Sequence, residues 1–304
     1  MPRANARLMR IVTLLAMFLP AGLAASQEHT LAVERDRPVG SKYQVVVKAS
    51  QTQTQKQTVN GQLVGNNTEK LTGSMTAVSE VLAVHDNKQV KQMKLVVSKF
   101  EGKAGEDEVK LDTTKPIIVT ADGGETTFKY EDGTALPDKA EQLLDILSGF
   151  MTDDSPGDAT QNQVFKLDKP RAKGSSWACD NELLAKQLSG GGELAIDPKD
   201  IESEFKFLDV AEFAGEESAV FDVAVKLNRF SVAGLDEVPG LNMTKSEGTL
   251  KMSGLLPLDP KSGAGALQMQ MDMAFDAEIK AEGQAVQISV TMKIEADAEY
   301  REVE

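Results

Sequence analysis

The sequence predicts a mainly β protein. We expect a strongly curved antiparallel sheet, a half-barrel or flattened barrel, built from two related halves with one amphipathic helix packed on it. Three observations carry this prediction. Apolar and polar residues alternate with a period of two along most of the chain, short turn-forming segments separate these runs, and only one long segment has helical spacing. The short spacing between runs favours antiparallel connections over crossover helices.

The alternation is clearest near the C-terminal end. In 267–279 the odd positions are apolar and most even positions are polar, and after a turn near Glu282-Gly283 the pattern resumes through 288–295. Two such runs joined by a short glycine-containing turn indicate a hairpin with one wet face. Similar runs occupy 42–49, 71–84, 89–100, 117–121, 126–130, 203–213, 219–230 and 247–253.

The predicted helix covers 138–151. Asp138 is in position to cap it, with Glu141 three residues later as the second half of a capping box. Its apolar face consists of Leu143, Leu144, Leu147, Phe150 and Met151. A shorter helical turn is expected from Asn181 to Leu188, before three glycines.

The chain also contains an internal match between its two halves. The segment from Val90 to Phe100 matches the segment from Val220 to Phe230 at a constant offset, and Gly40-Ser41-Lys42-Tyr43 matches Gly174-Ser175-Ser176-Trp177. The order of the two matches favours a duplication. We therefore expect a signal peptide (1–24), a flexible N-terminus (25–37), a first β half with the helix (38–151), a linker (152–162) and a second β half (163–304). The two halves form one continuous β unit or two closely packed repeats.

The first residues have the pattern of an export signal. Arg3, Arg7 and Arg10 precede a short apolar run that ends at Pro20, and cleavage is expected near Ala24 to Ser26. The alternative is an uncleaved anchor. The stretch before Ser26 resembles a lipoprotein cleavage box, but a serine stands where the lipid-bearing cysteine is required. We therefore expect a periplasmic or secreted protein with no stable membrane anchor after cleavage.

The composition limits the classes of partner that the chain can bind. The chain has 33 Lys+Arg against 47 Asp+Glu, a net charge of −14, which disfavours nucleic acids and anionic membranes. Cys179 is the single cysteine, so no intrachain disulfide forms. We expect a monomer.

No residue set predicts catalysis, a cofactor or a metal. His29 and His85 are the only histidines. Cys179 and His85 could form a thiol dyad, but the sequence favours a buried, inert thiol at Cys179. Acidic pairs are many, but nothing selects two for glycoside hydrolysis. Clusters at 106–108 and 153–154 lack the spacing of a calcium loop. The Met-x-Met-x-Met run admits a copper site, but it fits a core stripe or a soft cavity wall better.

That run defines the one candidate surface, which is either an apolar ligand face or a loosely filled core. Thioether side chains adapt to irregular shapes, so they suit either use. The surface consists of Leu143, Leu147, Phe150, Met269, Met271, Met273, Phe275, Ile288, Val290 and Met292.

Two stretches carry a resemblance to known proteins. The Gly-Ser-x-aromatic strand entry, and Glu247-Gly248-Thr249-Leu250 followed by Leu258–Gly263 and the Met-rich strand, resemble a family of exported bacterial β-rich proteins with a domain-of-unknown-function label. This resemblance covers most of 38–302. At fold level, a wide sheet curled around a helix is similar to the periplasmic carriers of lipoproteins and lipids.

The function expected from these observations is a non-catalytic binding or scaffold role in the cell envelope or medium. The partner is an apolar ligand or a segment of an envelope protein. The alternatives are a hydrolase with an unrecognised carboxylate site and a purely structural envelope component.

Overall fold

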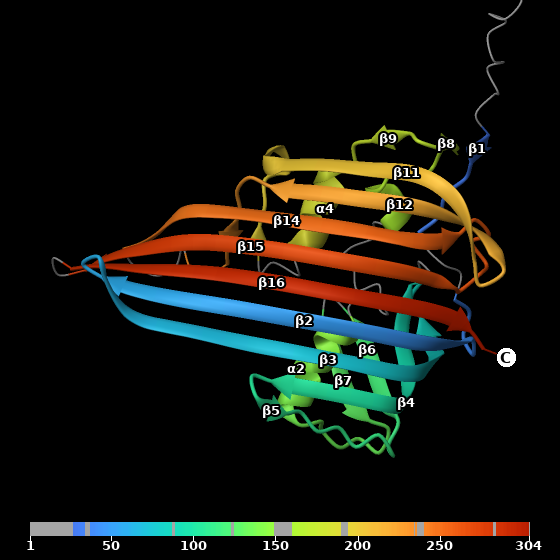
Figure 1. Cartoon of the computed structure of the whole chain (residues 1–304), viewed down its shortest axis with the longest axis horizontal. Coiled ribbons are helices and arrows are strands. Elements are labelled where there is room, and N and C mark those ends of the chain that lie inside the picture. Colours follow the sequence, from blue (N-terminus) through green and yellow to red (C-terminus); the bar gives the residue numbers. More distant parts are fainter. Residues whose placement is uncertain are drawn as a thin grey trace, which may run out of the picture.

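The computed structural model describes residues 27–33, 37–86, 89–122, 125–148, 160–189, 194–233, 235, 240–281 and 284–303. One antiparallel sheet of 12 strands dominates it (Figure 1). Its strands are β2 (Lys42–Val59), β3 (Gln62–Val84), β4 (Val90–Ala104), β5 (Asp107–Glu108), β6 (Ile117–Asp122), β7 (Glu125–Tyr130), β9 (Ser176–Trp177), β11 (Ile201–Phe213), β12 (Glu216–Leu227), β14 (Leu241–Pro257), β15 (Gly265–Ala281) and β16 (Gln284–Glu302). Their order is β7-β6-β4-β3-β2-β16-β15-β14-β12-β11-β9, with β5 on β4.

The remaining elements are short. β1 (Glu28–His29) pairs with β8 (Arg171–Ala172), and β10 (Leu194–Ala195) pairs with β13 (Ser231–Val232). The helices are α2 (Asp138–Ser148), α3 (Gln161–Val164), α4 (Asn181–Leu188) and the 3₁₀ turn η2 (Pro198–Asp200). The sheet is curved and is not closed into a barrel. The predicted fold class, an antiparallel curved sheet with an amphipathic helix on it, is confirmed.

Both hydrophobic cores lie on one face of this sheet. In an antiparallel pair, residues directly opposite each other point to the same side. One row of such partners crosses eight strands, so the cores of the two halves share a face and β16 joins β2 in a single sheet. The row runs Phe100, Met75, Val47, Ala298, Leu267, Gly254, Phe221, Phe207.

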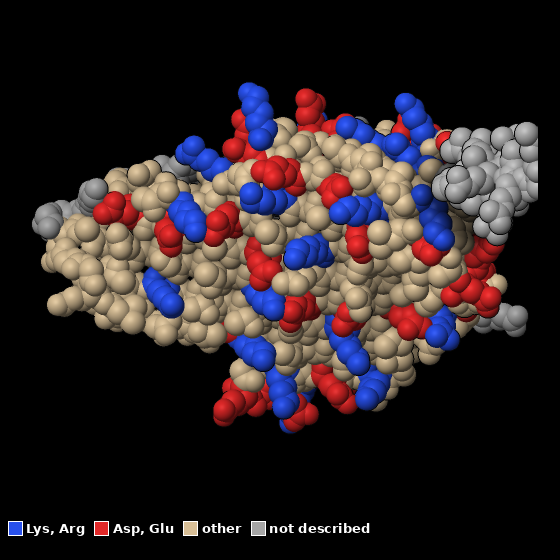
Figure 2. Space-filling model, turned by 45° about the horizontal axis from the view of Figure 1, so that its top comes forward, with Lys and Arg blue, Asp and Glu red and all other residues tan. Residues whose placement is uncertain are grey.

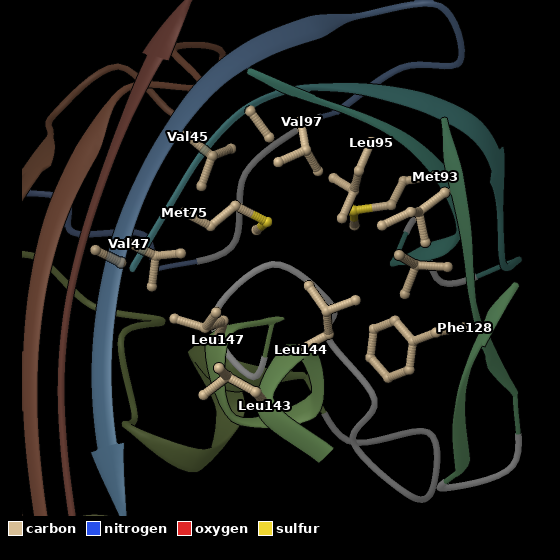
Figure 3. Close-up of a cluster of buried hydrophobic side chains, with 14 of the residues drawn as sticks. Val45, Val47, Met75, Met93, Leu95, Val97, Phe128, Leu143, Leu144 and Leu147 are labelled. Atoms are coloured by element: carbon tan, nitrogen blue, oxygen red, sulfur yellow. The ribbon is translucent and has the colours of Figure 1, made fainter. Parts of the chain in front are cut away.

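The first core forms where the strands arch around α2 (Figure 3). Leu143, Leu144 and Leu147 have no exposed surface. Asp138 is the first residue of the helix and not its cap, so the predicted capping box is wrong. The N–H of Glu141 donates to the carbonyl of Pro137, which places the cap at Pro137. The described helix ends at Ser148, and Phe150 lies outside the described residues.

The second core is richer in aromatic rings. Phe205 stacks on Trp177 and on Phe221, with ring centroids 4.9 Å and 5.4 Å away. The α4 helix forms at the predicted residues, with Asp180 accepting from the N–H groups of its first turn. Thr160 caps α3 inside the segment expected to be linker.

The N-terminal segment that the sequence analysis expects to be flexible is paired over part of its length. β1 forms an antiparallel pair with β8, and Leu31 is only 5% exposed in the second core. The backbone N–H of Val33 donates to Asn162. The burial of Leu31 explains why this segment is held in place. Fixing the backbone costs conformational entropy, and the burial of an apolar side chain offsets that cost. Residues 1–24, the expected signal peptide, lie outside the described residues.

The matched segments of the two halves occupy comparable places. β4, β3 and β2 neighbour one another in that order, and β12, β11 and β9 follow in the same order farther along the sheet. Met93 and Val223, which match in sequence, are both buried, one in each core. The duplication itself stays a prediction.

Strand length decides how much of the core face is covered. β16 has 19 residues, which at about 3.3 Å per residue extend roughly 60 Å. α2 has 11 residues, or about 16 Å of helix. α2 packs on β2, β3, β4 and β7, and α4 packs on β11. In Figure 1 the long central strands extend well beyond these helices toward the β2–β3 turn.

Candidate functional site: the methionine stripe

The predicted candidate residues of β15 and β16 lie side by side on the core face. Met271 is directly opposite Ile294, Met273 opposite Met292, and Phe275 opposite Val290. We call this surface the methionine stripe. It consists of Met269, Met271, Met273, Phe275, Ile288, Val290, Met292 and Ile294.

The stripe is intermediate between core and surface. All eight side chains are half-buried. Met273 and Phe275 pack against the second core. The stripe begins next to the two cores. The row of cross-strand partners that contains Met269 also contains Ala296 of the first core and Val223 of the second, and both of these are buried.

Leu143 and Leu147 lie apart from the stripe. Both point into the first core, among Met75, Phe128 and their neighbours (Figure 3). Their helix packs on β2, β3, β4 and β7, on the far side of β2 from β15. The structure thus places nine of the ten predicted residues in two groups, and the tenth, Phe150, lies outside the described residues.

A row of glutamines borders the stripe along β2. Gln51, Gln53, Gln55 and Gln57 are the direct partners of Ile294, Met292, Val290 and Ile288. The side-chain amide of Gln51 lies 3.7 Å from the sulfur of Met292, a contact of hydrogen-bond geometry. The alternation of apolar and polar residues did not predict this border, because residues 50–58 are polar on both faces. The signal that marks it is a glutamine at every second position.

A small pocket adjoins this border on the same face. Its volume is about 340 Å³, and it lies between β2, β3, the β4–β5 turn and the start of α2. Gln51 and Gln53 line it together with Leu71, Glu69 and Lys139. The pocket places polar and charged groups at the edge of the apolar stripe.

The opposite face of the sheet is hydrophilic. Lysines and acidic residues are interspersed across it in Figure 2. A hollow of about 550 Å³ lies over β12, β14 and β15, where Lys251 and Asp222 stand near Gln268. Such a surface of mixed sign does not attract one class of charged ligand.

The thiol and imidazole candidates are far from forming a dyad. Cys179 is 2% exposed, its backbone N–H donates to Ser203, and burial raises the pKa of its thiol. His85 contacts the carbonyl of Ala121 in the first half of the chain. His29 packs edge-on against Phe207.

Among the described carboxyl groups, those with a displaced pKa lie on the surface, and in each the pKa is lowered. The pKa of Asp132 is held below its ordinary value by hydrogen bonds from Lys115 and Thr134, and that of Asp209 chiefly by Lys173. The pKa values of Asp112, Glu202 and Glu204 are lowered as well. A general acid needs a raised pKa instead. Within the described ranges, no group of three or more His, Cys, Asp or Glu residues is arranged to hold a metal ion.

No described helix has both the length and the apolar composition needed to cross a bilayer. No protein-family model matches the chain, so membership of the exported β-rich family is not established. No curated protein matches it either.

Solved structures give distant likenesses. A lipovitellin structure on lipid–protein interactions has 11% identity and a TM-score of 0.34, covering 85% of this chain and 25% of that one. The outer membrane protein OprG of Pseudomonas aeruginosa has 8% identity and a TM-score of 0.20, covering 89% and 100%. MucB in complex with MucA(peri) has 10% identity and a TM-score of 0.21, covering 85% and 89%. The chain spans a quarter of the lipovitellin chain, and at these TM-scores the likenesses carry no argument about function.

Proposed function

We propose that this chain is a non-catalytic binding protein of the cell envelope or medium that holds an apolar, chain-like ligand on the methionine stripe. The observation that carries the proposal is the half-burial of eight adjacent apolar side chains on the face of the sheet that elsewhere forms the core. A contiguous, partly exposed apolar surface is typical of binding sites.

The shape of the stripe suits an extended ligand. From Met269 to Phe275 the strand advances about 20 Å, at roughly 3.4 Å per residue. Each buried methylene contributes about 0.8 kcal/mol, so a chain laid along the stripe gains affinity with its length. Thioether side chains adjust to such a ligand at low cost because they are unbranched and flexible.

The glutamine border offers the polar end of such a ligand a set of neutral partners. Gln51 and Gln53 also line the adjoining 340 Å³ pocket, near Lys139. An amide supplies two donors and one acceptor without the desolvation cost of a charge. This arrangement favours an amphiphile with one apolar chain over a fully apolar molecule.

The same geometry weighs against the alternatives. The carboxyl groups whose pKa is lowered, among them Asp132 and Asp209, lack the raised pKa that a general acid needs. A purely structural component has no need of flexible thioethers on a half-open face. A non-catalytic binding role therefore remains the proposal.

The test uses tryptophan to fill the stripe. Met271→Trp should lower binding of a fluorescent fatty acid at least tenfold while leaving the thermal midpoint unchanged or higher, because the larger side chain occupies ligand space. The matched control is Gln268→Trp, on the same strand and exposed on the opposite face. It should bind the probe like the wild type.

Three results would contradict the proposal. Wild-type protein that does not bind the probe, with no lipid in native mass spectra, leaves the stripe without a ligand. Destabilisation of Met271→Trp by about 1–3 kcal/mol would instead identify the stripe as a close-packed core. Loss of binding in Gln268→Trp alone would move the site to the hollow on the other face.

A further inference from the structure

The free end of the β2–β3 hairpin carries an unusual pair of exposed side chains. Leu63 is 61% exposed and Val64 is 59% exposed, and they are adjacent in sequence. They lie beyond the end of β4, where β3 pairs only with β2. We call residues 57–68, which include this pair, the hairpin tip.

The tip is a tight turn that is hydrogen-bonded to the neighbouring strand β16. Asn60 and Gly61 have φ values of 48° and 78°, which are typical of the tight two-residue turn favoured in hairpins. The N–H of Asn60 donates to the carbonyl of Ala285, and the N–H of Ala285 donates to the Asn60 side chain. A register shift between Gln57 and Thr58 leaves Val64 outside the ladder. The exposed pair is therefore presented by a braced structure.

The tip has no charged residue from Gln57 to Thr68, in a chain that is 26% charged. In Figure 2 the corresponding end of the molecule, at the left, is largely tan. Asparagine, glutamine and threonine surround the aliphatic pair. The tip therefore carries no charge that would have to be desolvated on contact with a lipid surface.

Apolar side chains continue on the core face from the methionine stripe to the end of the sheet at this tip. Beyond Ile288 the next partners on the same face are Val286, Ile279 and Val59, all half-buried. An extended ligand on the methionine stripe thus has an apolar path to this end of the sheet. Leu63 stands at the same end but on the opposite face, because its partner is Thr58, whereas Val59 pairs with Gln62.

We propose that the hairpin tip docks reversibly on a lipid surface of low charge and that the ligand passes there between the membrane and the methionine stripe. This inference rests on the proposed function. Two aliphatic side chains give only a small contact, far below the roughly 800 Å² per partner of a stable protein interface. A single myristoyl chain, which has more carbons than these two side chains, gives only marginal and reversible membrane binding, so the contact at the tip is weak and transient. The chain's charge of −14 opposes docking on an anionic surface.

The test measures flotation of the chain from residue 27 onward, which contains every described element, with phosphatidylcholine vesicles. The wild type should bind. The double variant Leu63→Gln, Val64→Thr should lose about tenfold or more in partitioning, since most of the aliphatic burial is removed. The matched control changes two exposed aliphatics elsewhere, Val39→Thr and Leu208→Gln, which are 60% and 41% exposed. It should bind vesicles like the wild type.

A second measurement separates the two proposals. The tip variant should bind the fluorescent fatty acid in solution, without vesicles, as well as the wild type does. A wild type that binds the probe but not the vesicles overturns the docking inference and leaves the proposed function standing. Vesicle binding without probe binding overturns the proposed function. Equal loss in the tip and control variants, or stronger binding to anionic vesicles, overturns the docking inference.

Discussion

Leu143 of α2 occupies the space that a side chain on Gly73 of β3 would need. A Cβ atom at residue 73 would lie 2.7 Å from Cδ2 of Leu143, closer than real Cβ contacts allow. Gly102, the cross-strand partner of Gly73, has the same relationship at 2.6 Å. The two glycines form a recess in the sheet in which the helix side chain sits, and this fixes the position of α2.

Gly73→Ala should therefore lower the free energy of unfolding by about 1–3 kcal/mol, measured by urea denaturation, because it overpacks the first core. Gly65→Ala is the matched control on the same strand. Its added Cβ would meet Gln57 at 3.6 Å, an ordinary contact, so little change is expected. Adding Leu143→Ala to Gly73→Ala should cost less than the sum of the two single changes. Full additivity would contradict the proposed recess.

Cys179 should behave as a buried packing residue. Cys179→Ser should lower stability by roughly 1–3 kcal/mol by placing a more strongly hydrated hydroxyl in a buried site, with ligand binding retained in the folded fraction. In native protein the thiol should react with a disulfide reagent orders of magnitude more slowly than in unfolded protein. Rapid native labelling, or loss of binding at unchanged stability, would contradict this role.

The pH dependence of that thiol has a defined sign. Burial raises the pKa of Cys179 above its ordinary 9.0. The unfolded chain therefore loses this proton first as the pH rises. The stability from burying a neutral thiol is fully present below about pH 9 and is lost as the pH rises through the folded pKa. Cys179→Ala should remove this part of the alkaline decline.

Asp132 should stay ionised well below pH 3.8. Its carboxylate accepts hydrogen bonds from Lys115 at 2.7 Å and from the backbone and side chain of Thr134. A lowered folded pKa contributes stability above the unfolded value of 3.8, and that contribution is lost as the pH falls through the folded pKa. Asp132→Asn should thus be destabilising near neutral pH, and the difference should shrink in acid.

Chemical denaturation at several pH values measures this effect. The matched control is Asp122→Asn, at the other end of the β6–β7 hairpin, where the lysine partner Lys91 lies 3.3 Å away. Because both carboxylates are solvent-accessible, salt should weaken the attraction between each of them and its lysine partner. A pH-independent difference for Asp132→Asn would contradict the assignment.

The sequence alone determined which side chains share a face. A period of two fixes the alternation of side chains along a strand, so Met269, Met271 and Met273 had to lie together. The same reasoning, with a period of 3.6, placed Leu143 and Leu147 on one face of a helix. These are local consequences of backbone geometry, and no distant contact was needed to predict them.

Only the tertiary structure decided which strands became neighbours and how much of their core face the helices cover. Alternation does not encode the pairing of β16 with β2, which joins the two ends of the chain along 17 register pairs from Val286↔Val59 to Glu302↔Tyr43. In that pairing the polar run of 50–58 forms a strand, and its glutamines lie beside the methionine stripe. The pairing also separated α2 from the methionine stripe, since the recess at Gly73 and Gly102 holds Leu143 on the other side of β2. Long-range pairing depends on closing the chain over hundreds of residues, and no local pattern carries that information.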